Sequence, residues 1–571
     1  MKHSLLLLLG VAFSLPAHAQ TWQDVQSKRS GEVAQMQALS MQVPVHAKSR
    51  LLYVNTSDLR AKLNQAPVGF LTTPNTTISL PLPGGKFATY TLYNSPIMAK
   101  ELALQNPDIQ TFRIMDAQNP ANTGRLDMSA SGFHAMFVRD GKTIFVDPVG
   151  SDGHYQSYFK SDYISEMEGK NHSPINCLIH GRDHKEQKPN PQNANKPDVS
   201  YGVNLRTYRL AVAGTGEFTA FHGGTKASSL AAMVTGINRV NQVFETDLAI
   251  KLEIIANNSD VIYTNANTDP YTDNDPVALI GEIVTDLNAK IGIANYDIGH
   301  VFSTGGGGLA GLGVVCSSIK AEGVTGSRNP INDPFFIDFV AHEFGHQYGA
   351  RHTFNGTAGA CGGNRSISAA YEPGGGTTIM AYAGICADEN IQNQGTDHYH
   401  NHSLGEITEF VTNGASGGSC GISTPLNNAV PVPNAGSDAN IPASTPFILT
   451  GSATDANAGD TLSYIWEQYD LGGSTSSKAT FTDDGTRPLF RSFSPSSSPS
   501  RIFPQINDIL SGTITYGEIL PTTNRDLNIR FTVRDGKGGV ASDTVKLTVS
   551  NAAGPFSVTA PGSVTWSANS N

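Results

Sequence analysis

Hydrophobic residues recur at helical spacing in two stretches of the middle of the chain, SSLAAMVTGINRVNQVFETDL (228–248) and PVALIGEIVTDLNAKIG (276–292). Apolar positions every three or four residues predict amphipathic helices. Three further runs are apolar and rich in β-branched or aromatic residues, which favours strands: LRTYRLAVA, LAIKLEII and YDIGHVFST. The pattern therefore predicts a domain of mixed α/β structure over residues 201–425.

Both ends of the chain show shorter, alternating patterns that are typical of β-structure. Before residue 180 the strand signals are KFATYTLY, GFHAMFVRDG and KTIFVDPV, and Arg139-Asp140-Gly141-Lys142 predicts a hairpin turn. Beyond a Pro/Asn/Gly linker near Pro431, short alternating runs separated by Gly and Asp turns predict an all-β sandwich at 431–550. Residues 551–571 look like the start of a further β module that stops abruptly.

Two segments mark the remaining boundaries. The N-terminus, MKHSLLLLLGVAFSLPAHAQ, has a short basic start, an apolar run and the small-x-small pattern Ala17-His18-Ala19, which predicts a signal peptide at 1–19. The stretch HGRDHKEQKPNPQNANKPDVS, residues 180–200, is polar and rich in Pro and Asn. That composition is typical of an exposed linker that a protease can cut. A β-rich region at 20–200 is therefore expected before the α/β domain.

Composition restricts the classes of partner and compartment. The net charge of -11 argues against a nucleic-acid partner, which would require a basic face. The apolar run of the leader is too short to span a bilayer and no later segment is apolar enough, so we expect a secreted, extracellular protein without a membrane span. Export permits disulfides. The five cysteines are an odd number, so at least one lies outside an internal pair.

The strongest chemical signal is HEFGHQYGARH, within the predicted helix DPFFIDFVAHEFGHQYG. His342 and His346 are four residues apart, so both imidazoles lie on one helix face and can share a tetrahedral metal ion. Glu343 faces the open side, where it can take a proton from water. Gly349 lets the helix end and the chain turn, which returns His352 as a third ligand. Three protein ligands indicate catalytic zinc; a structural site or a surface histidine cluster is the alternative.

The extended pattern HExxHxxGxxH resembles the signature of the metzincin metalloproteases, in which a Met-turn follows the zinc motif. The candidate turn is TIMAY, residues 378–382. The resemblance implies that the thioether of Met380 forms a floor beneath the imidazoles, whereas Met380 alone would indicate ordinary core. Tyr382 is more typical of astacin-like and serralysin-like enzymes, where such a tyrosine approaches zinc and stabilises the oxyanion. Tyr382 is either a mobile fifth ligand or an aromatic side chain in the wall of the site.

Within the metzincins, residues 205–425 resemble the adamalysin/reprolysin group, especially its secreted bacterial members, in the order of strands and helices. The resemblance implies a Gly-rich edge strand that pairs with substrate, GGLAGLGVV at 307–315, and a zinc helix after it. It also implies the disulfides Cys316–Cys420 and Cys361–Cys386, one of three pairings that the sequence allows.

The resemblance leaves a Ca²⁺ site open. An acidic residue of the first strand in that group is replaced by Arg209. The run DPYTDNDP, with Asp269, Asp273 and Asp275, is either a calcium site or a solvated turn.

Cys177 is the cysteine left over from this pairing, and it lies in INCLIHGRDH just before the linker. A thiolate binds zinc strongly and displaces the catalytic water, and many metzincin pro-segments block the active site with such a cysteine. We therefore expect residues 20–200 to be an inhibitory propeptide with Cys177 as fourth zinc ligand in the zymogen. His180 and His184 are alternative ligands, and a buried or unpaired thiol is the alternative role of Cys177.

These features predict a secreted zinc-dependent endopeptidase that cleaves protein or peptide substrates with zinc-activated water and Glu343 as general base. The C-terminal sandwich resembles PKD-like and other immunoglobulin-like modules, which bind matrix protein or polysaccharide or act as spacers. The alternative function is an adhesion or matrix-binding protein in which the protease domain is accessory.

Overall fold

The computed structural model describes the chain in nine ranges: 21–25, 48–69, 76–119, 121–150, 152–162, 177–180, 198–413, 416–475 and 477–556. Only the backbone is described at 177–180, so the side chains of Cys177 and His180 lie outside the description, as do those of residues 333–334. The predicted signal peptide, His184 and most of the predicted further β module also lie outside it.

The described part of the N-terminal region is an antiparallel sheet of nine strands in the order β1-β2-β9-β8-β7-β6-β5-β4-β3. The strands are β1 Trp22–Asp24, β2 Arg50–Val54, β3 Thr77–Pro81, β4 Phe87–Asn94, β5 Gln110–Met115, β6 Thr123–Ser129, β7 Gly132–Arg139, β8 Lys142–Pro148 and β9 His154–Phe159, with helices α2 Thr56–Leu63 and α3 Lys100–Gln105. The predicted hairpin is confirmed: Arg139 pairs with Lys142, and Asp140 and Gly141 have the positive φ angles of a two-residue turn. The β-rich character agrees with the sequence pattern.

A second sheet organises the middle of the chain, with the order β10-β15-β16-β14-β12-β13 and β17 antiparallel to β12. Its strands are β10 Cys177–His180, β12 Asn204–Gly214, β13 Ile250–Ile254, β14 Ile298–Ser303, β15 Gly307–Gly311, β16 Gly323–Gly326 and β17 Ile422–Pro425. The sheet is mixed, because β15 runs antiparallel to β16 while β16, β14, β12 and β13 are parallel. The α/β expectation and the three predicted strands are confirmed.

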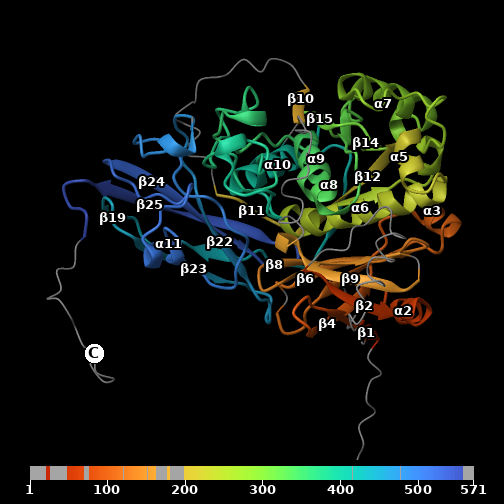
Figure 1. Ribbon diagram of the computed structural model, residues 1–571, viewed down its shortest axis with the longest axis horizontal. Coiled ribbons are helices and arrows are strands. Elements are labelled where there is room, and N and C mark those ends of the chain that lie inside the picture. The colour runs from red at the N-terminus through yellow and green to blue at the C-terminus, as the bar shows by residue number, and fades with distance from the viewer. Residues whose placement is uncertain are drawn as a thin grey trace, which may run out of the picture.

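Two helices cover this sheet as the hydrophobic pattern predicts: α6 Lys226–Leu248 and α7 Pro276–Lys290. Thr225 begins α6 with a capping box, and Asp275 caps α7 next to a proline in its first turn. Figure 1 shows α6 between the N-terminal sheet below it and the sheet of the middle region above it. The smaller helical elements are α5 Gly216–Phe221, η2 Asn258–Val261, η3 Ile293–Asn295, η5 Gly359–Cys361 and η6 Ala387–Glu389.

The motif-bearing helix is helical as predicted but not uniform. It consists of α8 Asn332–Phe335, a π-helical turn η4 at Phe336–Ala341, and α9 His342–Gln347. A π-helical turn inside an α-helix is rare and is often found at functional sites. The first histidine of the motif follows this turn directly.

The last helix of the middle region, α10 Asn401–Thr412, begins earlier than the sequence predicts. The pattern Ser403-Leu404-Gly405-Glu406 is typical of a capping box and predicts that the helix starts at Ser403. This prediction is wrong, because α10 begins at Asn401. The side chain of His400 accepts the capping hydrogen bond from the backbone N–H of His402. Glu406 instead binds Arg351, so a long-range ion pair replaces the local cap.

The C-terminal strands form a five-stranded sheet, β11-β25-β24-β22 with β19 on β25, and two smaller pairs, β18-β21 and β20-β23. The elements are β11 Ser200–Tyr201, β18 Val432–Asn434, β19 Ala439–Pro442, β20 Phe447–Thr450, β21 Ser452–Thr454, β22 Ser463–Gln468, η7 Lys478–Thr480, β23 Ser500–Phe503, α11 Ile506–Ser511, β24 Arg525–Arg534 and β25 Val540–Ser550. The short helix α11 departs from the all-β expectation. In Figure 1 these blue strands lie to the left of the sheet that contains β12 and β14.

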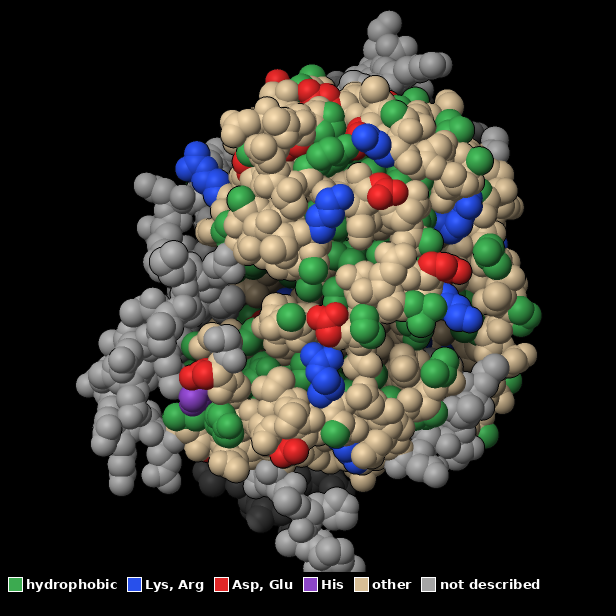
Figure 2. Space-filling view, turned by 90° about the vertical axis from the view of Figure 1, so that its right-hand side faces the viewer, with side chains coloured by type: hydrophobic (Ala, Val, Ile, Leu, Met, Phe, Trp, Pro, Cys, Tyr) green, Lys and Arg blue, Asp and Glu red, His purple; other side chains and the backbone are tan. Residues whose placement is uncertain are grey.

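Surface charge is mixed on the face of the molecule that Figure 2 shows. Figure 2 shows Lys and Arg side chains scattered among acidic ones on that face, with small apolar patches between them. Within the described ranges, the structure contains no helix long and apolar enough to cross a membrane.

Candidate metal centre

The three histidines of the motif converge on one buried point. The Nε2 atom of His346 lies 3.0 Å from Nε2 of His342 and 3.1 Å from Nε2 of His352. All three residues are at most 2% exposed. Tetrahedral coordination with metal–nitrogen bonds of about 2.0–2.1 Å places nitrogens about 3.4 Å apart, so the observed spacing fits a zinc ion between them.

The outer nitrogens of the rings fix their protonation. Nδ1 of His342 donates to the carbonyl of Ile379, and Nδ1 of His346 donates to Ala350, each at 2.7 Å. Nδ1 of His352 donates to the carbonyl of Asn364, also at 2.7 Å. A carbonyl only accepts, so each neutral ring carries its proton on Nδ1 and turns a bare Nε2 lone pair to the centre.

Burial favours the neutral form of His342 and His346. It lowers the pKa of His342 to about 4 and that of His346 well below its ordinary value. Neutral imidazoles with converging lone pairs repel one another unless a cation lies between them. The donor set therefore fits zinc.

Glu343 lies against β15 of the second sheet. It is 0% exposed, and a Cβ atom added at Gly308 of β15 would collide with its Oε1. Only glycine lets the strand approach the carboxylate this closely. Glu343 is therefore positioned between the histidines of α9 and the strand that the sequence predicts to bind substrate.

The turn after α9 has the predicted form. Gly349 has a φ of 93°, and its N–H donates to the carbonyl of His346. The N–H of Ala350 donates to Gly345, so the chain reverses tightly towards His352. Gln347 fixes α9 to the sheet, because its side-chain amide donates to the carbonyl of Gly299 in β14.

Met380 and Tyr382 lie on two sides of the histidines. Met380 is 0% exposed, and an added Cβ at Gly345 would collide with its sulfur, so the thioether lies beneath α9. The ring of Tyr382 packs against His352 with centroids 4.6 Å apart and against Phe354 at 4.5 Å. Tyr382 is 2% exposed and forms part of the buried wall.

Two disulfides brace the surroundings of the site. Cys316 is bonded to Cys420, and Cys361 to Cys386. These are the pairs that the family resemblance implies. The second bond closes the segment that contains the third histidine's carbonyl partner, Asn364, and Met380.

The strand β10 occupies the outer edge of β15. Cys177 pairs with Gly308 and His180 with Gly311 in a parallel ladder. The backbone at Cys177 therefore lies beside the glycine that contacts Glu343. The sequence places Cys177 before the linker but contains no local signal for this pairing.

The carboxylates of the acidic run at 269–275 accept hydrogen bonds from neighbouring residues. Asp273 accepts from Thr215 and from Thr304, and Asp275 caps α7. Within the described residues these carboxylates are not gathered at one point. Arg209 forms an ion pair with Asp297 at 2.7 Å. The calcium expectation therefore receives no support.

One residue that the sequence does not single out is Glu372. It is 1% exposed and accepts hydrogen bonds from residues on both sides of the site. The only sequence signal is its position as the single charged residue between Arg365 and Asp388.

Comparison with known protein families gives one match, in the middle of the chain. Residues 204–409 match the model of a family described as Metallo-peptidase family M12B Reprolysin-like. A search of curated proteins finds no match to the chain. The matched segment contains the three histidines, Glu343 and the Met380 turn.

Proposed function

We propose, from the premise that residues 204–409 form a reprolysin-type metzincin domain, that the chain is a secreted zinc endopeptidase made as an inactive precursor. The observation that carries this proposal is the convergence of three neutral imidazoles beside Glu343 at the edge of β15. Zinc affinity and a base next to a substrate-binding strand are the two requirements of this chemistry.

The side chains take separate roles in peptide hydrolysis. His342, His346 and His352 would hold Zn²⁺, which would supply Lewis-acid chemistry to the scissile carbonyl and to water. Glu343 removes a proton from the attacking water and later delivers it to the leaving amine. Met380 supports α9 from below, and Tyr382 forms the wall beside His352.

The substrate lies extended along β15. The inner edge of β15 pairs with β16, which leaves its outer edge for one more strand. In the present chain β10 takes that edge, so a substrate strand has to compete with β10 for it. Occupation of this edge by residues 177–180 supports a precursor whose N-terminal region, residues 20 to about 197, is inhibitory.

Cys177 completes the block in this proposal. Its backbone pairs with Gly308, the glycine against Glu343, and this register supports Cys177 as the fourth zinc ligand of the precursor. Thiolate binding removes the position that water needs for catalysis.

The helix α6 supports a removable N-terminal region. Its apolar face, with Val234 and Ile237, lies in the catalytic core. Its opposite face is polar and meets the N-terminal sheet: Thr235 binds Asp127, Asn238 binds the carbonyl of Leu126, Arg239 binds Asp147, Gln242 binds Thr123 and Glu245 binds Arg125. The contact also has an apolar part, because Met136, Phe145 and Tyr158 of the N-terminal sheet lie in the same buried cluster as Val234 and Ile237. The polar part of this helix face can be exposed to water after the N-terminal region leaves.

The test compares precursor and processed protein on a casein or quenched fluorogenic peptide substrate. Processed protein should cleave at internal bonds, lose activity with a zinc chelator and regain it when zinc is restored. Precursor should be silent, and Cys177→Ser precursor should show activity. Cleavage that is insensitive to chelator would contradict the zinc mechanism. A silent Cys177→Ser precursor would contradict the role of the thiolate but not that of zinc.

A further inference from the structure

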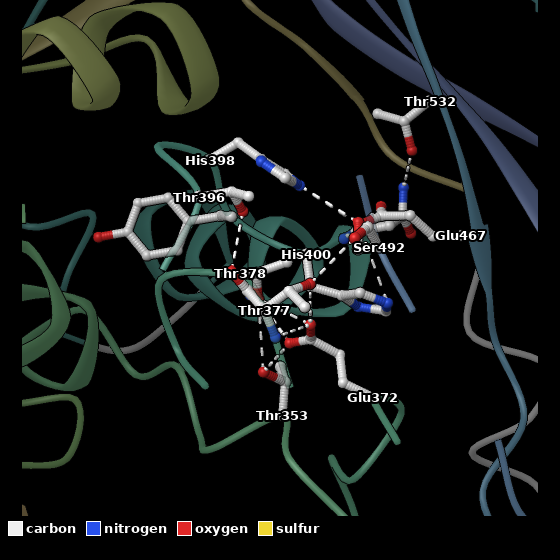
Figure 3. Close-up of polar contacts among 12 residues, drawn as sticks. Thr353, Glu372, Thr377, Thr378, Thr396, His398, His400, Glu467, Ser492 and Thr532 are labelled. Atoms are coloured by element: carbon white, nitrogen blue, oxygen red, sulfur yellow. Dashed lines mark hydrogen bonds and ion pairs between the residues drawn. The ribbon is translucent and has the colours of Figure 1, made fainter. Parts of the chain in front are cut away.

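Glu372 joins the two chain segments that carry the metal-facing side chains. Its Oε2 accepts from the hydroxyls of Thr353 at 2.5 Å and Thr378 at 2.6 Å. Its Oε1 accepts from the N–H groups of Thr377 at 2.8 Å and Thr378 at 3.1 Å, and from the Thr377 hydroxyl at 3.0 Å. Figure 3 shows the three threonines directed at this one carboxylate.

These threonines are direct neighbours of the site in sequence. Thr353 follows His352, and its N–H donates to the carbonyl of Met380. Thr378 precedes Ile379, whose carbonyl accepts from Nδ1 of His342. One carboxylate therefore sets the distance between the segment of the third histidine and the segment that orients the first.

The backbone around Glu372 is itself fixed. Its N–H donates to the carbonyl of Thr353 at 2.9 Å, and its carbonyl accepts from the N–H of Asn355 at 2.8 Å. The Cys361–Cys386 disulfide closes the loop that carries it. A side chain held on such a loop can hold other groups in place.

The chemistry at this position requires an acceptor. A carboxylate only accepts, and it meets five donors here. Hydrogen bonds to an ionised acceptor are shorter and stronger than neutral ones. Without it, the buried N–H groups of Thr377 and Thr378 would lose their partner.

The same network reaches the C-terminal strands. The Thr377 hydroxyl shares its one proton between Glu372 and the carbonyl of Ser492, which lies 3.1 Å away, and the Ser492 hydroxyl donates to Glu467 at 2.7 Å. Figure 3 shows this path from Glu372 to Glu467. The C-terminal strands therefore contact the turn that Glu372 holds.

We infer that Glu372 is a positioning residue of the metal centre, which holds His352 and the Ile379 carbonyl in the geometry that brings the imidazoles together. The inference rests on the proposed function, since it takes the three histidines as zinc ligands. Partners that orient metal ligands contribute about 10–100-fold to metal affinity.

The test measures metal binding in processed protein carrying Glu372→Gln, which keeps the volume but replaces one acceptor oxygen by a donor. Zinc affinity is measured by competition with a chromogenic chelator, and the site geometry by the visible spectrum of the Co²⁺ form. We expect zinc affinity to fall about 10–100-fold and the Co²⁺ bands to shift.

Asp483→Asn is the matched control. The carboxylate of Asp483 also accepts five hydrogen bonds, but in the C-terminal strands: from the N–H groups of Gly485, Thr522 and Thr523, the hydroxyl of Thr523 and Arg525. This variant should keep the zinc affinity and the Co²⁺ spectrum of the wild type, even where its thermal stability falls.

The inference is overturned if Glu372→Gln is folded and binds zinc and Co²⁺ as the wild type does. If Glu372→Gln does not fold, Thr378→Val decides, because it removes one donor to Glu372 and keeps the shape. A several-fold loss of zinc affinity supports the inference, and unchanged affinity overturns it. A wild-type protein that binds no zinc would instead refute the proposed function.

Discussion

Glu343 of α9 and Gly308 of β15 lie in direct contact, and the space for the Glu343 carboxylate exists only because residue 308 has no side chain. The contact joins the base to the strand that receives substrate. It also places the backbone of β10, paired at Cys177, within the same small region. In the proposed mechanism, catalysis and its inhibition therefore depend on one position of β15.

Gly308→Ala should fold and bind zinc but lose activity. The atom that the new Cβ would meet is the end of a flexible side chain, so the carboxylate moves and the strand stays. A misplacement of about 1 Å can cost about 100-fold in rate, and we expect a loss of that size in kcat/KM of the processed protein.

Gly306→Ala is the control for this substitution. A Cβ atom at position 306 meets open space, so hydrolysis should proceed at the wild-type rate. Wild-type activity in Gly308→Ala, measured with equal zinc content, would show that Glu343 is not the base.

The processing site should lie before Asp198. The backbone N–H of Val199 donates to the Ser542 hydroxyl, Asp198 accepts from Thr544, and β11 pairs with β25. Residues from Asp198 onwards thus belong to the C-terminal sheet and should stay with the processed protein. N-terminal sequencing of the active form should give a start between residues 181 and 198. A start after Asp198 would contradict this boundary.

Asp147→Asn should destabilise the precursor selectively. Asp147 is 1% exposed and forms an ion pair at 2.5 Å with Arg239 of α6, which is also buried. Loss of one partner of a buried pair costs about 3–5 kcal/mol, because the other charge stays buried. The precursor should unfold at a lower temperature and leak proteolytic activity.

Asp24→Asn serves as the comparison. Asp24 forms an ion pair with Arg50, but the Asp24 side chain is 56% exposed. Such a pair contributes about 0–1 kcal/mol. Equal thermal shifts in the two precursors would contradict the importance of the α6 contact.

Glu467 should make the protein sensitive to acid. Burial alone would raise the pKa of Glu467. The neighbouring His400 and His398 lower it by more than burial raises it, so the pKa of Glu467 lies below its ordinary value of 4.5. Below about pH 4.5 the unfolded chain takes up a proton that folded Glu467 does not, so the free energy of unfolding falls as the pH decreases.

Glu467→Gln should remove this part of the acid dependence. The melting temperature of the variant should fall less steeply than that of the wild type between about pH 5 and about pH 3. Glu409→Gln, an exposed change on α10, controls for the loss of one charge. Parallel curves for Glu467→Gln and wild type would refute the role of Glu467.

The sequence predicts the parts of the site that depend on local spacing. His342 and His346 lie one helical turn apart, and Gly349 takes the positive φ that its type favours, so the motif alone indicates their arrangement. The family resemblance adds Met380 and the disulfide pairs. Strands β12, β13 and β14 and both long helices follow from the pattern of hydrophobic residues.

Other features depend on contacts between residues distant in sequence and have no local pattern. The pairing of β10 with β15 joins segments about 130 residues apart, and nothing in either segment specifies it. The cap of α10 goes to His400 because Glu406 has a distant partner in Arg351. Glu372 accepts hydrogen bonds from Thr353, next to His352, and from Thr377, near Met380, and the order of these residues in the sequence does not reveal the contacts.

The central claim is that Glu343 acts as the base beside a zinc ion held by His342, His346 and His352. Its most direct test is the rate of internal cleavage of a fluorogenic peptide by processed Glu343→Gln protein that contains one zinc per chain. A general base contributes about 100- to 10,000-fold, and the account predicts a loss of that size with zinc content unchanged. Cleavage at the wild-type rate by the zinc-loaded variant would contradict it.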